Sequence, residues 1–198
     1  MGLKLASSYY QGSNVKSIAK NLIGKVLQAR IHNSITSGII VETEAYSYKE
    51  KGCHAYNYLR THRTDVMFSE GGVAYVYLCY GIHHLFNIVT NKIDKPEAVL
   101  IRALEPLEGQ KMMLKRMKYD SISKITSGPG KLTKALGIDR RLNGKSLMGG
   151  EIWLEDRGIK FATNEIVSAK RIGIDYAGDD ANLPWRFYVK GSEWISRP

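Results

Sequence analysis

The sequence predicts one mixed α/β (α+β) domain over residues 1–198, with a curved, mostly antiparallel sheet that is flanked by helices and carries a protruding β-hairpin. Three observations predict this fold. Several short segments alternate apolar and polar residues and are rich in β-branched and aromatic types, as strands are. A few segments have the three- and four-residue spacing of amphipathic helices. The chain is 43% hydrophobic and 24% charged, an ordinary globular composition, and no repeat or linker divides it.

Strands dominate the expected elements. They are predicted over residues 25–31, 38–45, 74–79, 82–90, 98–104, 151–155 and 185–190. The first two should flank a polar turn at 32–37, and Pro106 should end the fifth because proline donates no hydrogen bond to a ladder. The third and fourth meet at Tyr80-Gly81, which predicts a hairpin with an aromatic residue at its tip.

Helices are expected over residues 15–23, 107–117 and 131–136. Ser13 or Asn14 is available as the N-cap of the first helix, and Gly24 should terminate it. The third helix follows a glycine-rich turn at 122–130. Residues 46–64 have no strong pattern and form a long polar and aromatic loop, and long ordered loops in compact domains are often functional.

Charge and tyrosine content favour a polyanionic partner. The chain has 29 lysines and arginines against 19 aspartates and glutamates, a net charge of +10, and 12 tyrosines. Basic surfaces attract phosphate and tyrosine rings stack on bases, so nucleic acid is the favoured partner. Cys53 and Cys79 fit a reducing cytosol better than a disulfide framework. With no apolar run of membrane length and no secretory signal, we expect a cytoplasmic protein that does not bind a membrane.

Several common catalytic motifs fail on inspection. The Gly-Lys-Ser at 144–146 ends like a phosphate-binding loop, but Asp139 stands where that motif needs its first glycine. The adjacent His83 and His84 face opposite sides of a strand, which is poor geometry for sharing a metal. No Cys/His cluster has zinc spacing, and no G-x-S-x-G elbow occurs. The sequence therefore predicts neither a nucleoside triphosphatase nor a bound metal or other cofactor.

The most informative segment is VETEAY at residues 41–46. In a strand, Glu42 and Glu44 share one face, where two like charges repel unless a cation neutralises them. Arg102 is a candidate for that cation, because it interrupts the otherwise apolar strand VLIRALEP. The residues alone leave two interpretations open. One is a pair of solvated glutamates with a structural arginine, and the other is a catalytic carboxylate with its partner.

An ordered set of motifs resembles the alkyladenine (3-methyladenine) DNA glycosylase family of mammals and many bacteria. The resemblance extends over nearly the whole chain, and the order and spacing of the set are more specific than any one motif. The matching stretches are VETEAY at 41–46, His54, MF at 67–68, YVYLCYG at 75–81, FN at 86–87, VLIRALEP at 99–106, SGPGKL at 127–132 and RFYVKGSEWIS at 186–196. The resemblance implies a bacterial member of this family.

The resemblance assigns the chemistry to two residues and the recognition of the base to three. Glu44 matches the family's general base, which deprotonates a water that attacks C1′ of the deoxynucleotide. Arg102 matches the arginine that helps to hold the acid and the water, and its charge keeps the carboxylate ionised. Tyr46, His54 and Tyr77 match the residues that stack on the flipped base. Taken alone, Tyr77 would equally suit a core and His54 an ordinary loop.

Other matched residues would contact the DNA around the lesion. Tyr80 matches a tyrosine that wedges into the minor groove and fills the gap left by the flipped nucleotide. Asn87 matches an asparagine that crowds the 2-amino group of guanine. Without the resemblance, the first would be an exposed turn tyrosine and the second a strand asparagine bonded to the backbone. The turn expected at the DNA backbone is formed by Ser127, Gly128, Gly130 and Lys131.

The implied function is that of a monofunctional DNA glycosylase of base excision repair, acting as a monomer on double-stranded DNA with alkylated or deaminated purines. No lysine occupies the Glu44 position, so hydrolysis without a Schiff base or strand cleavage is expected. Between His54 and Met67 the loop departs from the family's T-P-R-N pattern. His62 replaces the proline and Thr64 the asparagine, which leaves the breadth of substrates open.

Two other interpretations remain. The chain could be a non-catalytic nucleic-acid-binding module that uses its basic and tyrosine surfaces, and would then bind single strands at least as well as duplex. It could also hydrolyse free nucleosides with the same base and the same stacking residues. That activity would require neither the wedge nor the positive charge.

Overall fold

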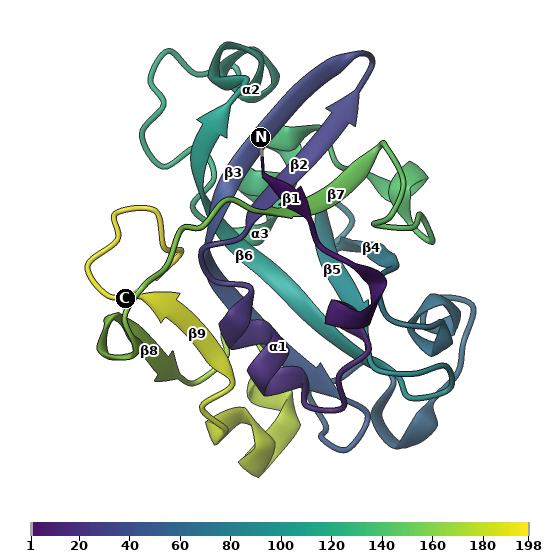
Figure 1. The fold of residues 1–198 in the computed structure, drawn as a ribbon. Helices are drawn as coiled ribbons and strands as arrows, with labels where there is room; N and C mark the ends of the chain where they lie inside the picture. The colour runs from purple at the N-terminus through teal and green to yellow at the C-terminus, as the bar shows by residue number, and fades with distance from the viewer. Residues whose placement is uncertain (1, 198) are drawn as a thin grey trace.

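The computed structural model describes residues 2–197. Their strands form one antiparallel sheet (Figure 1). The predicted α+β fold with a mostly antiparallel sheet is confirmed. The strands are β1 (Leu3–Lys4), β2 (Val26–Ile31), β3 (Ser34–Ser47), β4 (Ala74–Cys79), β5 (His83–Thr90), β6 (Glu97–Glu108), β7 (Ile152–Asp156), β8 (Ile166–Ala169) and β9 (Arg186–Val189). The α-helices are α1 (Val15–Asn21), α2 (Gln110–Met117) and α3 (Pro129–Leu136), and short 3₁₀ turns occupy several connections.

The strand order places β3 near the middle of the sheet. Across the sheet the strands follow the order β1-β7-β2-β3-β6-β5-β4, and β9, with β8 beside it, pairs with the second half of β3. Residues 34–39 of β3 pair with β2 and residues 42–44 pair with β9, while β6 runs along the other edge. The VETEAY segment therefore lies between β6 and β9.

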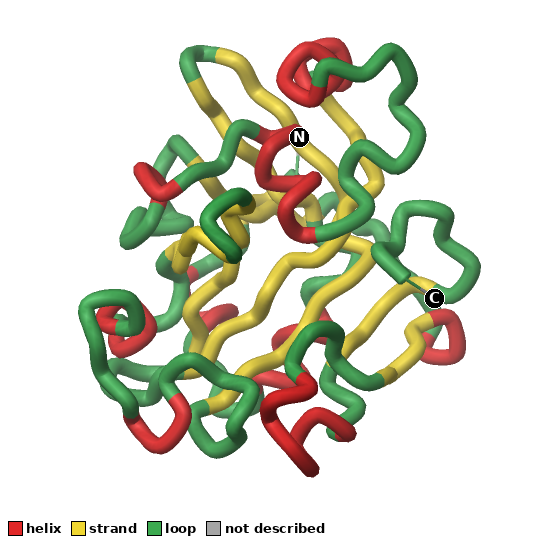
Figure 2. The backbone as a smooth tube through the Cα atoms, turned by 180° about the vertical axis from the view of Figure 1, so that it is seen from behind, coloured by secondary structure: helices red, strands yellow, loops and turns green. Residues whose placement is uncertain are grey.

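Helices cover the sheet and its ends. α1 lies against β3 and β6 (Figure 1). Its N-cap is Asn14, whose side chain accepts a hydrogen bond from Ser17 N at 3.1 Å, as one of the two predicted caps. α2 and α3 pack against each other, and α3 also contacts β5 and β6. From behind, the strands run through the middle of the molecule, with short helices and long loops around them (Figure 2).

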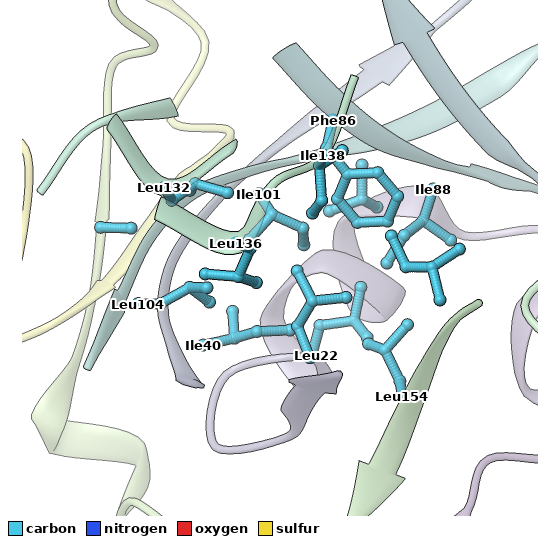
Figure 3. Packing of buried hydrophobic residues seen from close by; sticks show 14 of the residues in the cluster. Leu22, Ile40, Phe86, Ile88, Ile101, Leu104, Leu132, Leu136, Ile138 and Leu154 are labelled. Atoms are coloured by element: carbon cyan, nitrogen blue, oxygen red, sulfur yellow. The ribbon is translucent and has the colours of Figure 1, made fainter. Parts of the chain in front are cut away.

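The main hydrophobic core lies on the α1 face of the sheet. Leu22 at the end of α1 and Leu136 on α3 meet apolar side chains of the strands there (Figure 3). Because side chains alternate between the two faces of a strand, every second residue of these strands points into this core. Thr43 faces this side, since its hydroxyl donates to Ala19 O at 2.9 Å, and so does its cross-strand partner Ile101.

Two bulges lie together where β3 pairs with β6. The register shifts twice around Glu42, so that Val41 is an extra residue on β3 and Arg102 an extra residue on β6. Bulges of this kind bend a strand and redirect its side chains. Here they bring the Arg102 guanidinium within 3.1 Å of Glu42 and 3.2 Å of Glu44.

The polar turn predicted at 32–37 is wrong, because the chain turns at His32 and Asn33 alone. Both have positive φ, 48° and 61°, as a two-residue hairpin turn requires. The polar residues that follow belong to β3. Thr36 is fully buried, and its hydroxyl donates to a backbone carbonyl of α3 at 3.2 Å. The prediction is wrong because Thr36, although polar, is buried in a strand with a hydrogen-bond partner.

Pro106 does not end a strand, and this prediction is also wrong. β6 continues to Glu108, so the helix predicted at 107–117 begins only at residue 110. β5 pairs with β6 only over 97–100, so β6 has β3 as its strand neighbour at the proline, and a missing N–H is tolerated there. Gly109, with φ of 74°, then turns the chain into α2.

The remaining elements follow the predictions with small shifts. The β4–β5 hairpin is present, and Pro129 occupies the first turn of α3, where proline is favoured. β1 and β8 were not predicted, because two and four residues at the edge of a sheet carry no pattern. Among residues 2–197, no helix has the length and apolar character to cross a bilayer.

Candidate active site

A cavity of about 660 Å³ opens on the face of the sheet opposite α1. Since Thr43 and Ile101 face α1, the residues that follow or precede them face the other way. A row of cross-strand partners crosses the sheet on this face, one residue from each of four strands. The row consists of Glu44 on β3, Leu100 on β6, Asn87 on β5 and Tyr75 on β4. The last three line the cavity, and the glutamate lies behind its lining.

Glu44 is completely buried beside the cavity. Its carboxylate accepts three hydrogen bonds: from Ile172 N at 2.7 Å, from the Tyr46 hydroxyl at 2.7 Å, and from Nη1 of Arg102 at 3.2 Å. All three donors belong to residues that line the cavity. Donors of this kind favour the ionised carboxylate, which is the form that a general base requires.

Glu42 is a second buried carboxylate, on the other side of the same arginine. Its Oε1 accepts from Arg102 Nε at 3.1 Å, from Arg186 Nη1 at 3.0 Å and from the Ser196 hydroxyl at 2.9 Å. Its Oε2 accepts from Ser196 N at 2.6 Å. Two arginines therefore face two carboxylates in a buried cluster. The interpretation of Glu42 and Glu44 as solvated side chains is wrong, because both are 0% exposed.

The protonation states in this cluster follow from burial and neighbouring charge. Burial alone would lower the pKa of Arg102, but Glu44 and Glu42 together raise it, so the guanidinium stays charged. Burial and the adjacent Glu44 carboxylate both raise the pKa of Tyr46, so its phenol keeps the proton that it donates. The cations facing the carboxylates are arginines, and residues 2–197 hold no group of three or more His, Cys, Asp or Glu side chains fit for a metal ion.

Aromatic side chains form one wall of the cavity. The three residues expected to stack on a base, Tyr46, His54 and Tyr77, all line it. The His54 and Tyr77 rings meet edge to face with centroids 4.8 Å apart, and the Tyr75 and Tyr77 centroids are 5.2 Å apart. The structure therefore brings the predicted residues together and adds Tyr75 to them.

His54 is held by two hydrogen bonds that fix its tautomer. Nδ1 lies 2.9 Å from the Tyr75 hydroxyl, and Nε2 lies 3.2 Å from Nη2 of Arg63. Because arginine can only donate, Nε2 is the acceptor and Nδ1 carries the hydrogen. Burial, and then the charge of Arg63, lowers the pKa of His54 to about 4. The ring is therefore neutral at neutral pH.

The predicted wedge residue stands at the tip of the β4–β5 hairpin, on the rim of the cavity. Tyr80 is 89% exposed and has φ of 49°, and Gly81 beside it has φ of 72°. This pair of left-handed residues makes the tight turn that holds the ring out in solvent. Asn87, in contrast, is buried in the cavity lining and donates its side-chain amide to Tyr75 O at 3.2 Å.

The glycine-rich turn before α3 borders the same cavity. Gly128, Gly130 and Lys131 all line it. Gly128 has φ of 124°, which residues with a side chain rarely adopt, and a Cβ on Gly130 would lie 2.8 Å from the His83 ring. The hydroxyl of Ser127 is buried and has no hydrogen-bond partner among the described residues. Lys131, at the end of this turn, is exposed.

Three contributors to the buried cluster were not predicted from the sequence: Ile172, Arg186 and Ser196. They donate to the two carboxylates from 128, 144 and 154 residues away along the chain, in two cases through backbone N–H groups. No local pattern marks such a donor, so the sequence carried no signal for them. Tyr75 could have been found, since strand alternation puts it on the same face as Tyr77.

Comparison with known proteins assigns the chain to a family. The family model described as Methylpurine-DNA glycosylase (MPG) matches residues 8–193. A protein of Natranaerobius thermophilus named "Putative 3-methyladenine DNA glycosylase" is 44% identical over 198 residues, which cover 98% of this chain and 99% of that protein. A protein of the same name from Chlamydia abortus is 46% identical over 188 residues, which cover 93% and 97%. The resemblance inferred from the motifs is confirmed, and the chain belongs to the methylpurine-DNA glycosylase family.

Proposed function

We propose that the protein is a monofunctional DNA glycosylase that removes alkylated purines from duplex DNA by hydrolysis, with deaminated purines as a second substrate class. The observation that carries the proposal is the setting of Glu44. It is a buried carboxylate with three hydrogen-bond donors, directly behind a cavity walled by aromatic rings. The names of the relatives, which refer to 3-methyladenine in DNA, support the first substrate class.

In the proposed reaction, a water molecule attacks C1′ of the flipped nucleotide and passes a proton to Glu44. The electron pair of the N-glycosidic bond leaves with the purine, and the water oxygen stays on the sugar as a hydroxyl group at an abasic site. A purine alkylated at N3 or N7 carries a positive charge and departs as a neutral base, so it needs no proton from the enzyme. A well-placed general base contributes about 10²–10⁴-fold to such a step.

The residues around the cavity are proposed to recognise the lesion. Tyr46, His54 and Tyr77 would stack on the extruded base, and an electron-poor alkylated purine binds such rings well. Tyr80 would fill the gap in the duplex, as its exposed position on the rim suits. Asn87 would crowd the 2-amino group of an undamaged guanine. The turn at residues 127–131 would approach the DNA backbone.

Hydrolysis without strand cleavage is proposed because the buried group is a carboxylate. A lyase reaction needs an amine that forms a Schiff base at C1′. The product would therefore be an intact strand with an abasic site, which breaks only when it is treated with alkali.

The test uses two duplex oligonucleotides, one with a single 7-methylguanine and one with a single deoxyinosine. Each is incubated with the wild type or with Glu44→Gln, and the strand is then treated with hot alkali. We expect cleavage by the wild type only after alkali. The variant should fold, bind the damaged duplex and excise at least about 100-fold more slowly.

Glu97→Gln provides the matched control for that variant. Glu97 is also buried, at 4% exposed, and bonds to Ser47 and Asn91 rather than to the cavity lining. Its loss should affect stability but not excision. Near-full excision by Glu44→Gln would remove Glu44 from its role. Tight, salt-dependent binding by the wild type with no abasic product would favour the non-catalytic binding module.

A further inference from the structure

Arg171 is a buried arginine at the junction of four segments behind the cavity. Its side chain is 0% exposed. Nη1 donates to Glu50 Oε1 at 2.7 Å and to Ala45 O at 2.9 Å. Nη2 donates to Glu50 Oε2 at 2.7 Å and to Asp180 O at 3.1 Å. The guanidinium therefore ties β3, the loop after it and the segment around residue 180 to its own segment.

Two of the three donors to Glu44 lie next to this junction. The first is the N–H of Ile172, the next residue in the chain, which lies 2.7 Å from Glu44 Oε1. The second is the hydroxyl of Tyr46, 2.7 Å from Oε2. Cζ of Arg171 lies over that tyrosine ring, 4.8 Å from its centroid, and over the Trp185 ring at 5.2 Å. The third donor, from β6, is independent of the junction.

We propose that Arg171 is a positioning residue for the reaction, which places the Ile172 N–H and the Tyr46 hydroxyl against Glu44 and so maintains the carboxylate in its ionised form and its orientation. The inference rests on the proposed function, because it assumes that Glu44 is the general base. Arg171 itself does not line the cavity and would not touch the substrate.

Lysine cannot replace this arginine. The two terminal nitrogens of Arg171 reach four acceptors on three segments in a planar fork, whereas a lysine ammonium has three donors at a single point. With lysine the charge opposite Glu50 would remain, but the segment carrying Ile172 and the ring of Tyr46 would lose their support. A positional role therefore predicts that Arg171→Lys is defective although its charge is kept.

The pH dependence of the reaction should report this role. The charged and titratable groups that face Glu44 are Glu42 and Tyr46 on β3, Arg102 on β6, Arg186 on β9, and Arg171. Of these, Arg171→Lys changes only the last group and the placement of Tyr46. Fewer donors to the carboxylate favour its protonated form. The acidic limb of the pH–rate profile should therefore move to higher pH.

The experiment measures single-turnover excision of 7-methylguanine from duplex DNA between pH 5 and 9. The variants are Arg171→Lys and Glu50→Gln, which keeps the arginine but removes the charge opposite its fork. Arg116→Lys is the matched control, since Arg116 donates to Ala135 O at 3.0 Å and to Thr36 Oγ1 at 3.3 Å and does not line the cavity. Thermal unfolding and affinity for undamaged duplex are measured on each protein.

We expect Arg171→Lys to excise roughly ten- to a hundredfold more slowly at pH 7, to have an acidic limb at higher pH, and to bind duplex within threefold of the wild type. Glu50→Gln should move the acidic limb in the same direction by a smaller amount than Arg171→Lys. If Arg171→Lys does not fold, Glu50→Gln alone tests the inference. The control should lose stability and keep the wild-type profile. An unmoved limb, whatever the loss of rate, would overturn the inference. Wild-type protein that releases no base would instead overturn the proposed function.

Discussion

At the scale of single residues, His54 shows how burial can choose a protonation state. A histidine in water has a pKa near 6.5, whereas in this cavity burial and the charge of Arg63 lower the pKa of His54 to about 4. The folded protein therefore binds fewer protons than the unfolded chain between these two values. Protonation in that range must either break the contact of Nε2 with Arg63 or unfold the protein.

The stability of the fold should consequently fall as the pH is lowered from 6.5 to 4. A group with a lowered pKa in the folded state contributes its full stability above the unfolded value and loses it as the pH falls toward the folded one. The loss expected from His54 is about 2 to 3 kcal/mol. Urea unfolding at pH 7, 5.5 and 4.5 would measure it, and His54→Gln should flatten the dependence by that amount.

His62 on the same loop is the control for this prediction, because it is exposed and His62→Gln should leave the pH dependence unchanged. Equal pH dependence in the wild type and in His54→Gln would show that other groups account for the acid lability. The prediction concerns stability alone, so it holds whatever the protein's substrate.

At the scale of elements, the β4–β5 hairpin holds an exposed tyrosine, Tyr80, in a strained backbone conformation. A tyrosine at φ of 49° is less favourable than a glycine there by about 1 kcal/mol, and glycine in turn makes the unfolded chain more flexible by a similar amount. Tyr80→Gly should therefore change the free energy of unfolding by less than about 1 kcal/mol. Single-turnover excision should nevertheless fall roughly tenfold, since the duplex gap would lose its stacking partner.

A second exposed tyrosine provides the comparison for Tyr80. Tyr58 has φ of 61° and is 44% exposed, but it does not line the cavity. Tyr58→Gly should excise at the wild-type rate. In urea unfolding, the free energy of unfolding of both variants should be close to that of the wild type, and that of Tyr58→Gly slightly lower. Unchanged excision by Tyr80→Gly would mean that the hairpin tip plays no part in extruding the base.

Some elements and contacts of this fold can be predicted from the sequence, and others cannot. The hairpin and α1 follow from local patterns, because alternation and spacing act within a few residues. The pairing of Glu44 with Arg102, 58 residues apart, was predicted instead because a charge inside an apolar strand needs a partner. The extent of β3 does not, since its first residues are polar and are stabilised by partners in α3. The donors Ile172 and Ser196 are beyond local patterns altogether. Tertiary contacts more than a hundred residues apart bring them to the cluster.

At the scale of the whole molecule, the net charge of +10 favours binding to a polyanion such as the DNA backbone. The mouth of the cavity carries two exposed cations, Arg63 on the loop before β4 and Lys131 at the start of α3. Some of the other cations are paired with carboxylates, as Lys25 is with Asp156 at 2.7 Å. At least two of the cations available to phosphate therefore lie at the mouth of the cavity.

Binding to undamaged duplex should accordingly weaken as salt is added, with log K falling linearly against log salt concentration. Each phosphate contact contributes about 0.9 to that slope, so Lys131→Ala should reduce the slope by about 0.9 if Lys131 meets a phosphate. Fluorescence anisotropy between 50 and 300 mM salt would measure it. Lys160→Ala is the control, because Lys160 is exposed and does not line the cavity, and its neighbours Ile159 and Phe161 lie against Gly24, just after α1. Equal slopes for the two variants would mean that the positive charge acts diffusely and that the mouth of the cavity does not anchor the DNA backbone.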